Sequence, residues 1–182
     1  MAAIEAIETV YLEADAAVIN ISSIPSTYEH LMLRWSLSHL GTYSGGWVAL
    51  AAGYLELAGD TTGNNYRSGF MRGLQSGSSA SQFLAFATDS GAPTMSTFPN
   101  AQPKQIYGAA VAYILDYSTT NKKTTVIQDR GTTFDDSDYG STRYLEGGVW
   151  NNTPVIDEIE LSVSGGVIMR GSTVSLYGMN SS

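Results

Sequence analysis

The chain of 182 residues contains no cysteine, which excludes a disulfide framework, a thiolate metal site and a cysteine nucleophile. Its 17 acidic and 9 basic residues give a net charge of −8, and because such a surface repels phosphate backbones we expect no nucleic-acid partner. Only 14% of the residues are charged, whereas Gly, Ser, Thr and Tyr are abundant. This composition is typical of an all-β protein with many turns and argues against a helical one.

The first segment, Ile4–Leu12, fits either a short amphipathic helix or a strand, and its β-formers favour a strand preceded by a flexible arm. Glu5 and Glu8 occupy positions where a secretion signal would carry Lys or Arg, and no apolar run is long enough to span a bilayer. We therefore expect synthesis in the cytoplasm and no membrane partner. Residues 1–12 are a candidate N-terminal arm, and residues 13–182 form a single β-sandwich domain in this interpretation.

The strongest periodicity along the chain repeats every two residues, as in strands with one buried face. In Tyr28–Leu37, Leu31, Leu33, Trp35 and Leu37 share one face, and His30 and Arg34 lie on the other. Similar alternation predicts strands at Ala109–Tyr117, Val155–Val163, where Asp157 marks the strand's entry, and Thr173–Gly178. Weaker candidates are Ala17–Ile21, Trp47–Leu57, Tyr66–Leu74, Gln82–Thr88, Thr124–Gln128 and Arg143–Val149.

Turn-forming residues separate these segments. Gly59–Asn65 reads GDTTGNN and predicts a turn, Gly91–Pro103 holds three prolines and predicts a loop, and Gly131–Ser141 is polar and acidic and predicts another loop. No internal repeat and no change of composition marks a domain boundary. The sequence therefore predicts one all-β domain, an antiparallel β-sandwich of jelly-roll type with very little helix.

No catalytic constellation can be recognised in the sequence. His30 and His39 lack the spacing of a metal site, so we interpret both as structural. There is no GxSxG elbow and no phosphate-binding glycine loop. We predict no catalytic residue and no cofactor, and we expect that the protein is not an enzyme.

The acidic residues Asp135, Asp136 and Asp138 permit two further hypotheses. Paired carboxylates can hydrolyse glycosides, and the spacing of Asp136 and Asp138 beside Gly140 can wrap a calcium ion, although the full calcium-loop pattern is missing. An ordinary solvated loop is the favoured interpretation. The same choice between calcium ligands and turn residues applies to Asp60, Asn64 and Asn65. Trp47, Trp150 and the tyrosines could form a sugar-binding platform, but core or interface positions are favoured for most of them.

An ordered set of short motifs spans about residues 8–179. The opening motif Ile24–Leu31 reads IPSTYEHL, and a turn contains Gly59-Asp60 and Asn65-Tyr66. The later members are Tyr113–Tyr117 (YILDY) with Lys122-Lys123, Trp150 followed by Ile156, Ile159 and Leu161, and the closing strand Gly171–Gly178 (GSTVSLYG). This set resembles a family of small virion proteins of tailed bacteriophages and of their relatives integrated in bacterial genomes. The chain departs from the family pattern at Ala58, where the family has Asn.

The resemblance implies a structural part of the virus particle without an active site, made in the cytoplasm of the host bacterium. We expect an accessory protein that decorates the capsid surface, with a tail or tail-fibre component or a carbohydrate-binding receptor-recognition module as alternatives. The expected partners are the major capsid protein or other virion proteins and other copies of the chain, with a host surface glycan as a further candidate. Open strand edges and only three lysines predict a homo-oligomer, and the resemblance favours a trimer. We expect attachment to the particle through the N-terminal arm, because that segment is only weakly committed to the fold and can become ordered on a partner.

Overall fold

The computed structural model describes residues 4–41, 51–76, 79–85, 94–98, 107–136, 139–163 and 165–180. Strands dominate these residues, and their one helical element is the 3-10 turn η1 (Gly63–Asn65). In the part of the chain that is described, no helix is long and apolar enough to cross a membrane. The strands are β1 (Ile4–Tyr11), β2 (Val18–Ser22), β3 (His30–Leu37), β4 (His39–Gly41), β5 (Ala51–Leu57), β6 (Tyr66–Ser76), β7 (Ser79–Ala85), β8 (Thr94–Phe98), β9 (Gly108–Leu115), β10 (Thr124–Asp136), β11 (Tyr139–Trp150), β12 (Glu158–Val163), β13 (Gly166–Ile168) and β14 (Thr173–Met179).

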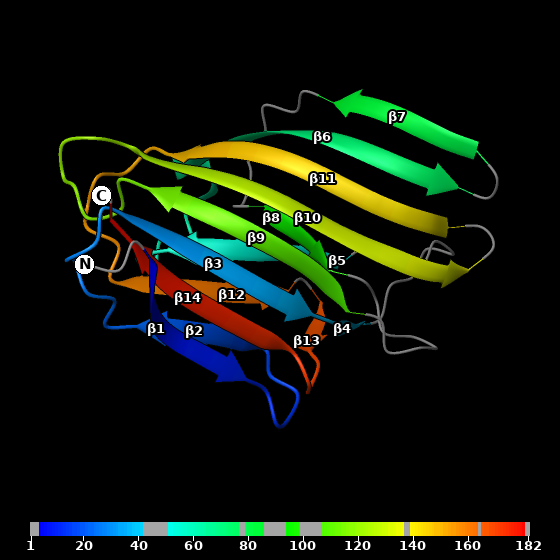
Figure 1. Cartoon of the computed structure of the whole chain (residues 1–182), viewed down its shortest axis with the longest axis horizontal. Coiled ribbons are helices and arrows are strands. Elements are labelled where there is room, and N and C mark those ends of the chain that lie inside the picture. The colour runs from blue at the N-terminus through cyan, green and yellow to red at the C-terminus, as the bar shows by residue number, and fades with distance from the viewer. Residues whose placement is uncertain are drawn as a thin grey trace.

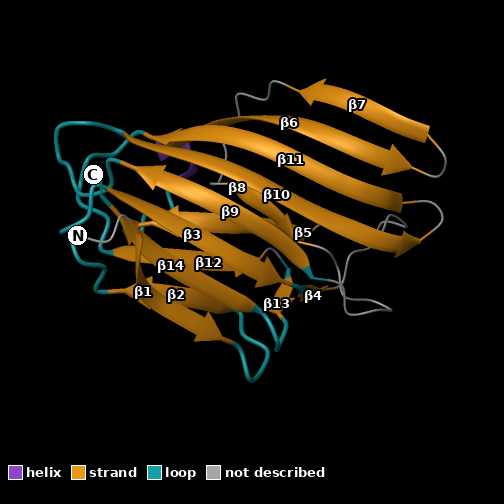
Figure 2. Ribbon diagram, in the orientation of Figure 1, coloured by secondary structure: helices purple, strands orange, loops and turns teal. Residues whose placement is uncertain are grey.

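The larger sheet has eight strands in the order β1-β14-β3-β9-β10-β11-β6-β7 (Figures 1 and 2). Every neighbouring pair in this sheet is antiparallel. The sheet brings the C-terminal strand β14 between β1 and β3, so both ends of the described chain lie in one half of it. Its other half consists of the long strands β10, β11 and β6 with β7 at the edge.

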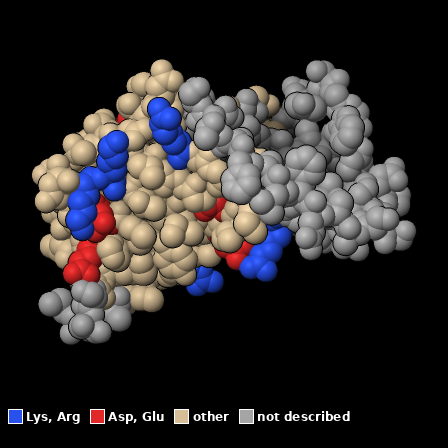
Figure 3. All heavy atoms as spheres, turned by 90° about the horizontal axis from the view of Figure 1, so that it is seen from above, with Lys and Arg blue, Asp and Glu red and all other residues tan. Residues whose placement is uncertain are grey.

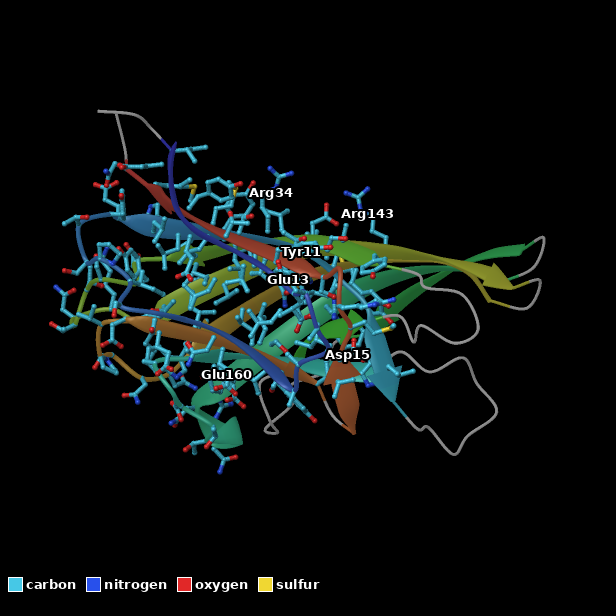
Figure 4. The ribbon with its side chains drawn as sticks, turned by 90° about the horizontal axis from the view of Figure 1, so that it is seen from below. Tyr11, Glu13, Asp15, Arg34, Arg143 and Glu160 are labelled. Carbon is cyan, nitrogen blue, oxygen red and sulfur yellow. The ribbon has the colours of Figure 1, made fainter. Side chains whose placement is uncertain are left out.

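The smaller sheet has four antiparallel strands in the order β2-β12-β5-β8, and β13 pairs with β4 in a short third sheet. The two main sheets form two layers, which are seen edge-on in Figure 4. The predicted all-β antiparallel sandwich is thereby confirmed, and the arrangement is compatible with the jelly-roll type.

The core lies between the two layers and follows the predicted alternation. Every second residue of β3, from Leu31 to Leu37, is buried against the smaller sheet. The smaller sheet contributes its own inward rows, since β2, β5 and β12 also alternate. The buried side chains of these three strands are Ile19, Ile21, Leu55, Leu57, Ile159 and Leu161. Because the inward positions are nearly all aliphatic, this interior supports the fold without a disulfide.

Two of the predicted loops are wrong. The segment Gly131–Ser141 was expected to be an acidic loop, but β10 continues to Asp136 and β11 begins at Tyr139, so the segment is the distal part of a hairpin. The loop predicted at Gly91–Pro103 contains β8, and its remaining residues lie outside the described part. In both places main-chain pairing with a neighbouring strand prevails over a turn-rich composition.

The N-terminal segment is a strand, as its β-forming residues indicate. Residues 4–11 of the candidate arm form β1, which pairs with β14 through a register shift between Ala6 and Glu8. They are therefore the edge strand of the larger sheet. Other boundaries differ slightly from the prediction: β12 begins at Glu158, so Asp157 just precedes the strand, and Ile156 rather than Val155 is buried.

Candidate functional site

A trough runs across the outer face of the larger sheet. Its volume is about 1190 Å³, and its floor is a row of small side chains that the strand register aligns. Thr173 in β14 pairs with Ser36 in β3, Ser36 with Ala109 in β9, and Ala109 with Gly131 in β10. The hollow exists because four neighbouring strands place a small residue at the same height.

Large side chains border this floor. Arg143 in β11 pairs with Gly131 and closes one end, while Tyr11 in β1 pairs with Thr173 beyond the other. Tyr113 and Tyr177, on the outer face of β9 and β14, line one side. The alternation in β9 was recognised from the sequence, and the structure shows that its buried residues are Ala112 and Ile114, so Tyr113 is 39% exposed. The trough is therefore bordered by aromatic rings and floored by small, partly hydroxylic residues.

Tyr107 fixes the remaining side of the trough. Its hydroxyl donates a hydrogen bond to the carbonyl of Arg170 at 2.8 Å, and its ring lies against Gly171. Gly171 has φ +83°, and a Cβ there would come within 2.7 Å of the Tyr107 hydroxyl, so this contact requires glycine. Beyond Tyr107 lies a second hollow of about 440 Å³, lined by Tyr11, Leu12, Glu13, Tyr107, Arg170 and Gly171. The two hollows thus share one aromatic wall.

The charges in the trough are partly paired. Arg143 donates two hydrogen bonds to the Asp129 carboxylate, from Nε at 3.0 Å and from an η nitrogen to Oδ2. These hydrogen bonds lower the pKa of Asp129 despite its partial burial. Arg34 has no carboxylate partner among the described residues. Figure 4 shows Arg34 and Arg143 projecting from the same outer face, whereas Glu160 lies on the opposite side of the molecule.

Directly behind the trough, the inner face of β10 and β11 carries a buried ion pair. Arg130 donates to the Glu146 carboxylate at 2.9 Å, and the side chains are only 9% and 3% exposed. The Arg130 guanidinium also lies 4.3 Å from the ring centre of Tyr144. Burial raises the pKa of Glu146 and lowers that of Arg130, in each case against the attraction of the partner. Arg130 Nε and one η nitrogen, together with both amide atoms of neighbouring Gln128, lack a hydrogen-bond partner in the described structure.

The outer face of the smaller sheet carries a pair of carboxylates. Glu56 in β5 lies directly opposite Glu160 in β12. Burial, the charge and hydrogen bond of Glu160, and the charge of Asp60 all raise the pKa of Glu56. In the view of Figure 3 charged side chains are few, and most of the described surface is uncharged. Two facing carboxylates alone are a source of repulsion and do not make a binding site.

The turn residues considered as calcium ligands have a structural role. Both carboxylate oxygens of Asp60 accept hydrogen bonds, from Trp150 Nε1 at 2.7 Å, Asn65 Nδ2 at 2.8 Å and the Thr62 main chain at 2.9 Å. Trp150 itself is 1% exposed, so it is a core residue and no sugar platform, as the favoured interpretation expected. Trp47, the other tryptophan considered, lies outside the described residues.

The remaining candidate ligands are the aspartates of the β10–β11 hairpin and the two histidines. Asp135 and Asp136 lie at the end of β10, and Asp138 falls outside the described residues. His30 Nδ1 accepts a hydrogen bond from the Asp116 main chain at 3.1 Å, while His39 is buried in β4, where desolvation lowers its pKa. Within the described ranges, no group of three or more His, Asp or Glu side chains could hold a metal ion.

Sequence reasoning did not find the trough, whose residues are far apart along the chain. The signal that was available is the outer face of β3, where Arg34 and Ser36 stand opposite the buried leucines. That pattern predicts an exposed face, but it does not show which residues of the other strands lie beside it.

Comparisons with known proteins do not assign the chain to a family. No family model and no curated protein matches it. Among solved structures, the chain is similar to a mutant of the alginate lyase Aly36B in complex with an alginate trisaccharide. The two chains are 13% identical over 89% of this chain and 80% of that chain, with a TM-score of 0.30. A likeness at this level carries no inference about activity.

Proposed function

We propose that this chain is a non-enzymatic structural component of a tailed-phage virion, an accessory protein that decorates the capsid surface. The sequence resemblance suggests this role, and one observation supports it: the motif residues that carry the resemblance are engaged in holding the fold. Among the contacts described for them, none places a nucleophile beside a general base.

Three of the motifs meet at one end of the sandwich. The Tyr117 hydroxyl donates to the carbonyl of Pro25, and the Ser118 hydroxyl donates to the carbonyl of Tyr28 at 3.0 Å. The Tyr28 ring lies over Gly178, where a Cβ would approach ring carbon to within 2.3 Å. The opening motif, the YILDY motif and the closing strand therefore form one joint. The motif residues therefore stabilise the fold, as expected of a structural component of a particle.

Exposed apolar side chains on the outer face of the larger sheet support this role. Met71 in β6 pairs with Leu145 in β11, and they are 49% and 50% exposed. Ile127 in β10, on the same face, is 42% exposed. We call Met71, Ile127 and Leu145 the apolar patch. Exposed apolar residues that lie close together are typical of protein interfaces, and here the partner is the major capsid protein.

The proposal is tested on particles. Gold-labelled antibody should cover the capsid of intact virions, and particles from a phage lacking the gene should lose that label. Label confined to the tail would support the tail or tail-fibre alternative and contradict decoration of the head. Absence of the protein from purified particles would overturn the virion role altogether.

The apolar patch gives a sharper test of the same role. The variant Leu145→Glu should fail to decorate capsids that lack the protein. Because Leu145 is exposed and lies outside the core, the urea unfolding midpoint of this variant should be nearly unchanged. Glu160→Gln, on the opposite face, is the matched control and should decorate normally. Normal decoration by Leu145→Glu would exclude the patch as the contact surface.

A further inference from the structure

We propose that the trough and the adjoining hollow bind an extended oligosaccharide that carries carboxylate-bearing sugars. The inference goes beyond the proposed particle role. The trough borders the apolar patch on the same face, because Tyr113 of the trough pairs with Ile127 and Asp129 pairs with Leu145, so binding is proposed for the free chain and is tested on it. The proposal rests on the shape of the floor, the rings that border it, and the basic side chains that have no carboxylate partner.

The shape suits a linear chain. The row of paired residues from Tyr11 to Arg143 crosses six strands, a span of about 24 Å at the usual spacing of about 4.8 Å between strands. With the second hollow beyond Tyr107, the depression is long and shallow and has no deep enclosed pocket. A chain of several sugar rings can lie along such a path, whereas a compact cofactor would find no enclosure.

The chemistry of the walls and floor suits sugars better than a protein segment. Tyr107, Tyr113 and Tyr177 present ring surface on which the apolar face of a sugar can stack. Ser36 and Thr173 provide hydroxyl groups in the floor that have no hydrogen-bond partner among the described residues. The apolar patch, which a protein partner would bury, lies beside the trough and not within its floor, although Met32 and Val111 also line the trough.

The charges select acidic sugars of modest charge density. The guanidinium groups of Arg34 in the trough and of Arg170 in the second hollow form no ion pair among the described residues. The main chain of Arg170 donates a hydrogen bond to the Asp15 carboxylate at 2.8 Å, and Glu13 also lines the second hollow. Arg143 is already paired with Asp129. In a chain of net charge −8, two unpaired guanidinium groups along one groove are complementary to a ligand with widely spaced carboxylates. A densely charged polyanion would instead be repelled by the acidic remainder of the surface.

Binding can be measured by titration calorimetry of the full chain with three probes of one length. These are a hyaluronan octasaccharide, which alternates carboxylate-bearing and neutral sugars, the same oligosaccharide with its carboxyl groups reduced, and an oligomer of galacturonic acid, in which every sugar is charged. We expect the hyaluronan octasaccharide to bind most tightly. Carboxyl reduction should weaken binding about tenfold, as expected when charge-assisted hydrogen bonds to arginine are lost.

Substitutions distinguish binding in the trough from non-specific electrostatic attraction. Arg34→Gln and Tyr113→Ala should each weaken binding of the hyaluronan octasaccharide about tenfold or more. Lys122→Gln changes the net charge as Arg34→Gln does but lies in the turn after β9, paired with Asp116, so it should bind as the unmodified protein does. Circular dichroism and the urea midpoint establish that each variant is folded.

Three results would overturn the proposal. One is failure of both acidic probes to bind at millimolar concentration. Another is an equal loss of affinity in Lys122→Gln and Arg34→Gln, which would show non-specific attraction. The last is light scattering that shows dimers whose formation Tyr113→Ala abolishes, because the trough would then be an interface between copies. None of these results bears on whether antibody labels the capsid, so the two proposals fail separately.

Discussion

Trp150 and Asp60 lie 90 residues apart in the sequence, and the indole Nε1–H of Trp150 donates a hydrogen bond to Asp60 Oδ2 at 2.7 Å. The same turn is closed by Tyr66, whose hydroxyl donates to the Asp60 carbonyl at 2.8 Å and accepts from the Leu57 main chain at 3.0 Å. The rings of Tyr66 and Trp150 are stacked, with centres 6.4 Å apart. One turn therefore connects the end of β5 in the smaller sheet with β6 and β11 in the larger sheet.

The first prediction concerns this connection. Asp60→Asn keeps the size of the side chain but removes the charge that strengthens three hydrogen bonds, so the free energy of unfolding at pH 7 should fall by about 1–3 kcal/mol. The measurement is urea denaturation followed by tryptophan fluorescence. Asp157→Asn, an exposed carboxylate just before β12, is a suitable control and should change stability little.

The pH dependence of this effect has a definite sign. Burial alone would raise the pKa of Asp60, but hydrogen bonds from Trp150, Thr62 and Asn65 prevail and lower it below the ordinary 3.8. The stabilisation is therefore complete above the unfolded pKa and is lost as the pH falls through the folded pKa. The stability difference between the two proteins should shrink steadily below about pH 4. A difference that is constant down to pH 2 would contradict the role of the charge.

The second prediction concerns the turn that follows β5. Ala58 has φ +52° and Gly59 has φ +65°, so both residues of this turn adopt the left-handed conformation. Alanine is strained there by roughly 1–2 kcal/mol, whereas asparagine adopts this region more readily. Ala58→Asn should raise the free energy of unfolding by up to about 1 kcal/mol. Ala58→Val should lower it, because a β-branched residue tolerates positive φ poorly, and a stabilised valine variant would contradict the strain argument.

The elements that were predictable from sequence are those with one buried and one exposed face. In β3 the alternation from Leu31 to Leu37 follows from contact with the smaller sheet, so residue type alone reveals the strand. The outer part of the β10–β11 hairpin was missed because its polar, glycine-rich sequence resembles a loop. There Gly131 pairs with Arg143 and Thr132 with Thr142. This pairing is made by main-chain hydrogen bonds, which do not depend on residue type and so cannot be recognised in the sequence.

The trough was beyond sequence reasoning for a related reason. Thr173, Ser36, Ala109 and Gly131 become neighbours only when the order β14-β3-β9-β10 and its register are known. Each of them alone is an ordinary small residue. By contrast, the structural roles of Asp60 and Trp150 were among the interpretations that the sequence favoured, since turn-rich segments and buried tryptophans are common in β-proteins.

The third prediction concerns the buried pair behind the trough. Glu146→Leu leaves the Arg130 guanidinium buried without its carboxylate and should lower the free energy of unfolding by about 3–5 kcal/mol. The double variant Arg130→Met/Glu146→Leu should recover most of that loss, because replacing both charges by apolar groups removes the desolvation penalty. Asp129→Asn breaks the exposed pair on the other face and should have an effect below about 1 kcal/mol. A double variant as unstable as Glu146→Leu would show that Arg130 has a further essential partner.

The last prediction concerns Glu56 and Glu160 on the outer face of the smaller sheet. Like charges directly opposite each other on neighbouring strands destabilise a sheet, so Glu56→Gln should raise the free energy of unfolding at pH 7 by about 0.2–1 kcal/mol. Because burial and Glu160 raise the folded pKa of Glu56 above its ordinary 4.5, the penalty develops as the pH rises from the unfolded pKa through the folded one. The gain should therefore disappear below about pH 4, where both proteins carry a neutral side chain at residue 56.

Urea midpoints at pH 7 and pH 4 measure this gain in stability. Glu158→Gln is the control, because Glu158 accepts a hydrogen bond from Asn20 and its neutralisation should not raise stability. An equal gain at both pH values would mean that the substitution acts through packing and not through the charge of Glu56.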